Sequence, residues 1–378
     1  MSDSESEVIT DLSNPDVTTK YQTAAGIANK ALEAVIAACV PGADIATVCE
    51  LGDKIILEEA AKLYNKKDKN GEKITKGIAF PTCISPNEIS GHFSPLKDES
   101  RAIVAGDILK IDLAAHIDGF ASAVAHTILV GDAPVKGRAA DAMHAAYNAI
   151  EVALRKLKVG SNSTEVTAAI QAVAKEYEVE AIQGIFSYET KQHRMDGGKC
   201  FAQGPNPGLN LENFQFGLNE VYGLDIILTT GDGRVKETDI RTTVVKRSHE
   251  NTYHLKTQKG REFISELTKI APSLMVSMRQ IEDPLVAKAG SAEARRHKLV
   301  EDFPVLKGKD GEIIVQFKFT VLLLPGGTKK ITGLTFDQAD KFVTEKTIKN
   351  EELKALLATT ANPKKLKKKA NAAAATSK

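Results

Sequence analysis

Apolar residues recur at helical spacing in several stretches of the chain, and each stretch predicts an amphipathic helix packed against a core. The first apolar face consists of Ala24, Ile27, Ala28, Ala31, Leu32, Val35 and Ile36. The motif Pro41-Gly42 then ends the helical pattern. A second face follows at Ile45, Val48, Leu51, Ile55 and Ile56. Two further helices are expected at residues 137–156 and 163–177.

Strand-like patterns separate these helices. Residues 107–130 are β-like throughout, and Asp118-Gly119 in their middle has the chemistry of a tight turn, which predicts a hairpin. Further strands are expected at residues 77–84, 220–230, 240–246 and 313–324. Because helices and strands alternate in blocks, the sequence predicts a mixed α and β layered architecture.

Three segments differ in character from the main body. Residues 1–14 are acidic and polar, which predicts a flexible N-terminus. Residues from about 255 to 303 are highly charged and helix-like, and strand character returns only at Ile313. We therefore expect a helical subdomain inserted between strands of the main sheet. Residues 361–378 are rich in Ala and Lys and contain no acid, which predicts a disordered basic tail.

Composition narrows the class of protein. The 50 Lys and Arg residues nearly cancel the 49 Asp and Glu residues, so any attraction to nucleic acid must be local. The four cysteines lack the spacing of a zinc or redox motif, which indicates a reducing compartment. The acidic N-terminus is unlike a secretory signal, and no apolar run reaches the roughly 20 residues that cross a bilayer. We therefore expect a cytoplasmic or nuclear protein without a membrane partner.

Four sequence blocks, in this order, resemble the signature segments of the type 2 methionine aminopeptidases. They are Gly91-His-Phe-Ser-Pro95, Lys110-Ile-Asp-Leu-Ala-Ala-His-Ile-Asp-Gly119, Glu220-Val-Tyr-Gly-Leu-Asp225 and Gln316-Phe-Lys-Phe-Thr-Val321. The similarity extends over about residues 15–345. It implies an α+β pita-bread fold, in which a curved antiparallel sheet is backed by helices and carries an inserted helical subdomain. It also implies a monomer.

The resemblance includes the positions of a metal centre. In that family two aspartates, one histidine and two glutamates hold two divalent ions, and a further histidine contacts the substrate. Such ligands neutralise two adjacent dications and make the bridging water nucleophilic. Matched one position at a time, the substrate-contact histidine is His92 and the first metal aspartate is Asp112. Both residues are present.

The other four ligand positions are altered. The second aspartate should follow the first by eleven residues, where Ala123 stands with only a methyl group. The metal histidine falls at Tyr188, the first glutamate at the shorter Asp225, and the second glutamate at Lys318. At best two carboxylate ligands remain, and a cation occupies the place of a bridging anion. The resemblance therefore implies a protein without metal, cofactor or peptidase activity.

We consider separate hypotheses for three residues, Lys318, His92 and Asp118. Lys318 is expected to replace the metal by pairing with one or both of the surviving aspartates, because it would relieve their repulsion. His92 could still contact a bound peptide, although a hydrogen-bonded remnant of the old site is the commoner case. The turn chemistry of Asp118-Gly119 accounts for Asp118 without a relocated metal site.

The lost ligands, the block Phe80-Pro-Thr-Cys-Ile-Ser85 and the lysine-rich tail resemble the proliferation-associated branch of the family, whose fungal members are called curved DNA-binding proteins. This resemblance implies a non-catalytic protein that binds ribosomal RNA, pre-ribosomal particles or the large ribosomal subunit, and curved DNA. Such a protein would act in ribosome biogenesis, translation or growth control, and it would be found in the nucleus, the nucleolus and the cytoplasm. Two alternatives stay open: an active metallo-aminopeptidase with substitute ligands, and an adaptor that binds peptides in the cleft.

Clustered lysines mark candidate contacts with nucleic acid, although such clusters are more often simply solvated. The tail offers Lys364, Lys365, Lys367, Lys368 and Lys369, a run suited to phosphate contact with strong salt dependence and little sequence preference. The body offers further candidates, which need not share one face: Lys62, Lys66, Lys67, Lys69, Lys73, Lys76, Lys246, Arg247, Lys256, Lys259 and Arg261. No aromatic stacking platform is evident, since the chain has no Trp and only 5% aromatic residues.

Overall fold

The computed structural model describes residues 10–67 and 71–361. The predicted helices form as α1 (Pro15–Ala38), α2 (Ile45–Ala61), α3 (Arg138–Lys156) and α4 (Ser163–Glu176). Asn14 begins α1, because its side chain accepts a hydrogen bond from the Asp16 N–H and Pro15 has no N–H to leave unpaired. The side chain of Asp44 caps α2 by accepting from the Thr47 N–H. Local sequence chemistry thus sets the first helix boundaries.

Within the described residues, nine strands form one antiparallel sheet in the order β1-β3-β4-β15-β9-β7-β8, with β16 beside β15 and β6 beside β9. Their bounds are β1 (Lys76–Pro86), β3 (Ile108–Ile117), β4 (Phe120–Leu129), β6 (Glu180–Ala181), β7 (Phe186–Glu189), β8 (Cys200–Ala202), β9 (Val221–Thr229), β15 (Ile314–Leu324) and β16 (Gly327–Lys330). The predicted hairpin is confirmed as β3 and β4. Its turn contains Asp118 and Gly119, both with positive φ.

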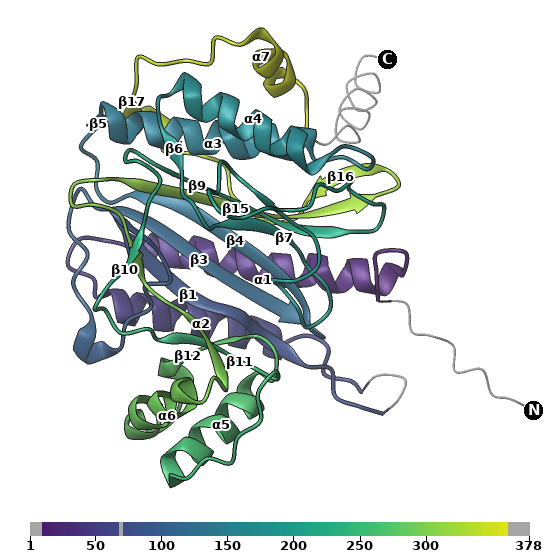
Figure 1. Cartoon of the computed structure of the whole chain (residues 1–378), viewed down its shortest axis with the longest axis vertical. Coiled ribbons are helices and arrows are strands. Elements are labelled where there is room, and N and C mark those ends of the chain that lie inside the picture. The colour runs from purple at the N-terminus through teal and green to yellow at the C-terminus, as the bar shows by residue number, and fades with distance from the viewer. Residues whose placement is uncertain (1–9, 68–70, 362–378) are drawn as a thin grey trace, which may run out of the picture.

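Helices cover one face of this sheet in two pairs (Figure 1). One apolar core joins α1 and α2 to β1, β3 and β4, and a second joins α3 and α4 to β9 and β15. Side chains alternate between the faces of a strand, so Phe317 and Phe319 of β15 enter the core beneath α3. Their neighbours Gln316, Lys318 and Thr320 point to the opposite face. The expected pita-bread architecture is confirmed.

The insertion differs from the purely helical expectation. Three short strands, β11 (Val244–Arg247), β12 (Met275–Ser277) and β13 (Val300–Phe303), pair in the order β12-β11-β13. Next to them lie α5 (Gln258–Ile270) and α6 (Ser291–Arg296), at the lower end of Figure 1. The expectation that strands return only at Ile313 is therefore wrong. β11 overlaps the strand expected at residues 240–246, whereas β12 and β13, of three and four residues, are too short to show an alternating pattern in the sequence.

A buried ion pair attaches the insertion to the body of the protein. The Arg279 Nη2 lies 2.7 Å from the Asp53 Oδ2 on α2, and the two side chains are only 4% and 10% exposed. The same guanidinium donates a hydrogen bond of 2.5 Å to the Ser94 Oγ. Three segments distant in sequence therefore meet at Arg279.

Both ends of the fold extend beyond their predicted limits. Leu12 is buried against Val17 and Tyr21, so the described part of the N-terminal segment contributes to the core, contrary to the expectation for residues 1–14. After β15 the chain packs Ile348 and Leu353 into the core beside α3, so the fold continues past residue 345. The lysine-rich stretch of the tail lies outside the described residues.

The remaining elements are short. They are β2 (Ile89–Gly91), β5 (Val135–Lys136), β10 (Lys236–Glu237), β14 (Leu306–Lys307), β17 (Phe342–Val343), α7 (Glu351–Ala358) and the turns η1 (Lys97–Glu99), η2 (Met278–Gln280), η3 (Val286–Gly290) and η4 (Ala339–Lys341). None of the helices within the described residues is both long and apolar enough to span a membrane.

Candidate functional site

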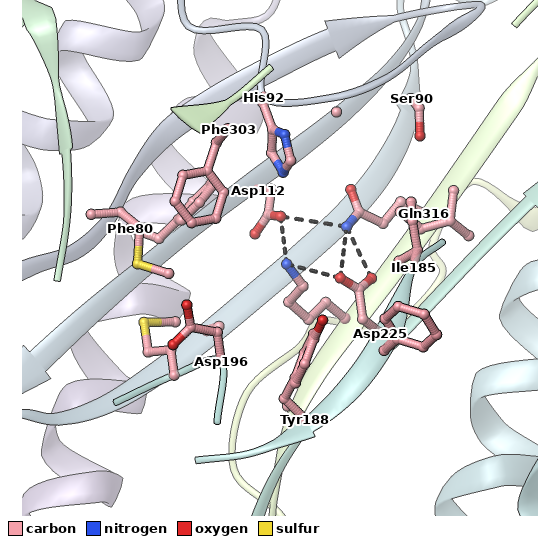
Figure 2. A pocket seen from close by; sticks show the side chains of 18 of the residues that line it. Phe80, Ser90, His92, Asp112, Ile185, Tyr188, Asp196, Asp225, Phe303 and Gln316 are labelled. Carbon is pink, nitrogen blue, oxygen red and sulfur yellow. Dashed lines mark hydrogen bonds and ion pairs between the residues drawn. The ribbon is translucent and has the colours of Figure 1, made fainter. Parts of the chain in front are cut away.

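Asp112, Lys318 and Asp225 lie in one row across the middle of the sheet. Asp112 on β3 pairs in register with Ala125 on β4, and Ala125 pairs with Lys318 on β15. Lys318 in turn pairs with Asp225 on β9. Directly paired residues of adjacent strands point to the same face. The three charged side chains therefore converge on the face opposite the helices, where Figure 2 draws their contacts as dashed lines.

Lys318 forms ion pairs with both surviving aspartates. Its Nζ lies 2.5 Å from the Asp112 Oδ2 and 3.0 Å from the Asp225 Oδ2. The three side chains are 17%, 10% and 12% exposed, so water screens these contacts weakly. The pairing that the sequence predicted is confirmed.

The charges of this cluster depend on one another. Burial opposes the charge on Lys318, but Asp112 and Asp225 outweigh burial and raise the pKa of the ammonium above its ordinary value. Burial raises the pKa of Asp225, and Lys318 counteracts this effect. Lys318 therefore stays charged near neutral pH while it contacts both acids.

Gln316 donates further hydrogen bonds to both carboxylates, while the Asp112 Oδ1 has no partner among the described residues. Its Nε2 lies 2.9 Å and 3.2 Å from the two oxygens of Asp225, and 3.4 Å from the Asp112 Oδ2. Gln316 belongs to the last of the four sequence blocks, but its role could not be predicted from that block. The available signal was its position two residues before Lys318, which places both side chains on one face of β15.

His92 is held at the cavity by a backbone contact. Its Nδ1 lies 3.0 Å from the Pro304 carbonyl oxygen, and burial lowers the pKa of the imidazole. A neutral ring that donates from Nδ1 leaves Nε2 as an acceptor. The ring packs edge-on against Phe303 and tilted against Phe80, with centroid distances of 5.5 Å and 5.9 Å. His92 is therefore a hydrogen-bonded residue, which is the commoner of the two cases considered from the sequence.

Ala123 and Tyr188 also line the cavity, so all the predicted metal positions are brought together. The backbone of Ala123 exchanges hydrogen bonds of 2.8 Å with the Thr320 hydroxyl, and its side chain offers no ligand atom. Burial raises the pKa of the Tyr188 phenol, which therefore stays protonated near neutral pH.

The cavity encloses about 250 Å³ and has mainly apolar walls. These walls include Phe80, Ala121, Ile185, Phe186, Met195, Ile227, Met275, Phe303 and Leu306. Part of the wall comes from the insertion, which contributes Met275 and Phe303. Such a space can hold an apolar group, but its floor is occupied by the Lys318 cluster.

The donor set does not fit two divalent ions. Repulsion between an ammonium and a dication about 4 Å apart is roughly 8 kcal/mol at an effective dielectric constant of about 20, twice the value for two unit charges. Among the described residues, no group of three or more His, Cys, Asp or Glu side chains is arranged to hold a metal ion. These residues therefore provide no means of activating water with a pair of metal ions.

The other predicted candidates lie elsewhere. Asp118 occupies the hairpin turn and forms an ion pair of 2.8 Å with Lys20, while the His116 Nδ1 accepts a hydrogen bond from the Gly119 N–H. Lys246 is neutralised by Asp196 and Glu301 at 2.6 Å and 3.1 Å. Lys364, Lys365, Lys367, Lys368 and Lys369 fall outside the described residues, so their role stays a prediction.

Comparison with known proteins relates this chain to one family. A model of metallopeptidase family M24 matches residues 19–204. ErbB-3 binding protein 1 of Arabidopsis thaliana is 41% identical, over 92% of this chain and 87% of its own length. Proliferation-associated protein A of Dictyostelium discoideum is 40% identical, over 96% and 92% of the two chains. The curved DNA-binding protein of Schizosaccharomyces pombe is 38% identical, over 98% of both chains.

A solved structure agrees with these relationships. The structure of a thermophilic Arx1 superposes with a TM-score of 0.83 and 30% sequence identity, over 92% of this chain and 99% of the other. The similarity therefore includes the insertion as well as the main sheet.

Proposed function

The chain belongs to metallopeptidase family M24, in its proliferation-associated and curved DNA-binding branch, and we propose that it is a binding protein without peptidase activity. The single observation that carries this proposal is the position of Lys318, whose ammonium contacts Asp112 and Asp225 where the family resemblance places a metal-bridging carboxylate. The lysine pairs with one oxygen of each carboxylate and would repel a dication at the same point.

The altered ligand positions Ala123 and Tyr188 also support this proposal. Ala123 lacks a donor atom, and the protonated phenol of Tyr188 is a poor substitute for an imidazole. Restoring a metal pair would require several changes at once, because removal of Lys318 alone leaves only two carboxylates. The apolar cavity can outlast the chemistry, since its walls also pack the insertion against the sheet.

For the binding partner, we propose ribosomal RNA within pre-ribosomal particles or the large ribosomal subunit, with curved DNA as a further ligand. The family resemblance of the sequence supports this assignment, and the S. pombe relative bears the name of a curved DNA-binding protein. The acid-free lysines of residues 364–369 suit contact with phosphates. We propose the nucleus, the nucleolus and the cytoplasm as its locations, because a role on pre-ribosomal and ribosomal particles requires them.

Two assays on the full-length protein test the two halves of the proposal. In the first, methionyl peptides are incubated with the protein and added Mn²⁺ or Co²⁺, and the proposal expects no release of methionine above the rate of the same mixture without the protein. In the second, the protein is sedimented with purified large ribosomal subunits at low and high salt. We expect co-sedimentation that weakens as salt rises.

Each assay also has a result that refutes its half of the proposal. Metal-dependent turnover that a D112N variant abolishes would make the protein an active aminopeptidase with substitute ligands. Failure to sediment with the subunits at low salt would remove the ribosomal assignment. Binding of peptides without any salt-sensitive binding of RNA would favour a peptide adaptor.

A further inference from the structure

Two aromatic side chains of the insertion stack face to face on its surface. Tyr253 precedes α5, and His297 follows the last residue of α6, so 44 positions of sequence separate them. Their ring centroids are 3.5 Å apart and their planes differ by 9°. Tyr253 is 36% exposed. The composition gave no sign of this pair, because folding brings together two rings that are distant in the sequence.

Three cations border the same groove. Lys256, Lys259 and Arg296 line it together with the stacked pair, and none of the three forms an ion pair within the described residues. An ammonium or guanidinium that is unpaired on a surface is available to an external anion. The groove therefore combines an aromatic pair with three cations, which outnumber its two carboxylates, Glu262 and Glu293.

The acids of the groove have other partners. The Glu293 carboxylate accepts from the Lys256 N–H at 3.0 Å and also contacts the Thr257 hydroxyl, which caps α5. The Glu262 Oε1 accepts from the Gln258 side chain at 2.7 Å. These contacts hold both carboxylates toward the helix backbone and its first turn, so they stabilise the groove itself.

We propose that this groove binds an unpaired nucleobase of RNA, which stacks on the Tyr253–His297 pair while Lys256, Lys259 and Arg296 contact the flanking phosphates. The inference rests on the proposed function and names the part of the RNA that is recognised. Aromatic stacking is tolerant of base identity, because every base has a π face. A duplex keeps its bases within its own stack, so a bulge, loop or single strand is the preferred ligand.

This site has a different role from the basic tail. Lysines of a tail bind phosphates through counterion release and do not distinguish paired from unpaired RNA. A stacking site makes that distinction, because it gains contact only with a base that is free. The groove thus supplies structural selectivity, and the tail supplies affinity.

The test uses the full-length protein and a single-stranded RNA of about 12 nucleotides, a length within the site sizes of proteins that bind single strands. The RNA carries the fluorescent base 2-aminopurine at its centre. Binding should quench the 2-aminopurine fluorescence, as stacking on an aromatic ring does. The Y253L variant keeps an apolar side chain but removes the π face, and we expect it to lose roughly tenfold in affinity and most of the quenching. The Y253F variant keeps the ring and should match the wild type.

A second pair of variants separates charge from stacking. The double variant K256Q/K259Q should lower the slope of log affinity against log salt by about 0.7 for each lost phosphate contact while quenching at saturation persists. The control K54Q changes an exposed lysine of α2 and should leave the slope unchanged. Thermal unfolding of each variant verifies that it is folded.

The possible outcomes test the stacking site separately from the proposed RNA-binding function. If the wild type binds the RNA, and Y253L binds and quenches equally well, the stacking site is refuted while the proposed function stands. If the wild type binds a duplex of the same length more tightly than the single strand, the inference is also refuted. If the wild type does not bind RNA at low salt, the proposed function fails first.

Discussion

The Lys318 ammonium reaches across β4 to the Asp112 carboxylate on β3, at a distance of 2.5 Å. The contact joins two strands that are not neighbours in the sheet. A buried pair of this kind is costly to break, because removal of one partner leaves the other charge without compensation. Loss of either partner of this cluster should therefore destabilise the fold.

Replacement of Lys318 by methionine should destabilise the protein strongly. The K318M variant leaves Asp112 and Asp225 buried together without a cation, and we expect the free energy of unfolding to fall by about 3 kcal/mol. Denaturant unfolding measures the change. The control K54M removes a surface pair with Glu58, whose side chains are 70% and 57% exposed, and should change stability by less than about 0.5 kcal/mol. Equal effects of the two variants would contradict the account.

The loss in K318M should depend on pH. Burial already raises the pKa of Asp225, and removal of Lys318 raises it further. The folded variant then binds protons more tightly than the unfolded chain, so its free energy of unfolding increases as the pH falls from about 7 to about 5. The difference in stability between wild type and variant should therefore narrow in acid. A difference that widens toward acid would show that the two aspartates are not the source of the strain.

Much of the Lys318 site could be predicted from the sequence, because its residues stand at the metal-ligand positions of the family and their identities alone show which ligands are altered. The long helices and the hairpin were also predictable, since ten or more residues express their periodicity. Other features require the folded chain. Gln316 acquires its role from carboxylates on β3 and β9, and the stack of Tyr253 on His297 joins residues that no local pattern connects.

The attachment of the insertion gives a separate prediction. The R279L variant leaves Asp53 buried on α2 without its partner, and we expect a loss of about 3 kcal/mol in the free energy of unfolding. The K288A control removes a pair with Asp98 whose side chains are 32% and 64% exposed, and should cost no more than about 1 kcal/mol. Denaturant unfolding compares the variants. Similar stabilities of R279L and wild type would mean that Arg279 is not the anchor.

Deletion of the basic tail tests the electrostatic part of nucleic-acid binding. A chain that ends at residue 361 lacks Lys364, Lys365, Lys367, Lys368 and Lys369. We expect weaker binding of RNA at low salt and a shallower dependence on salt, because fewer counterions are released. The preference for unpaired over paired RNA should persist. Unchanged affinity at low salt would assign the binding to the body of the protein alone.

The most direct test of the central claim is a calorimetric titration of the full-length protein with Mn²⁺ and with Co²⁺, followed by metal analysis of the dialysed protein. An active type 2 methionine aminopeptidase serves as the positive control. Because Lys318 occupies the place of a metal-bridging carboxylate, we predict no stoichiometric binding at the cavity of the wild type. K318M should show the same weak background, because its two remaining carboxylates are too few to hold a metal pair. Two ions bound per chain, displaced when Asp112 is changed to Asn, would contradict the account.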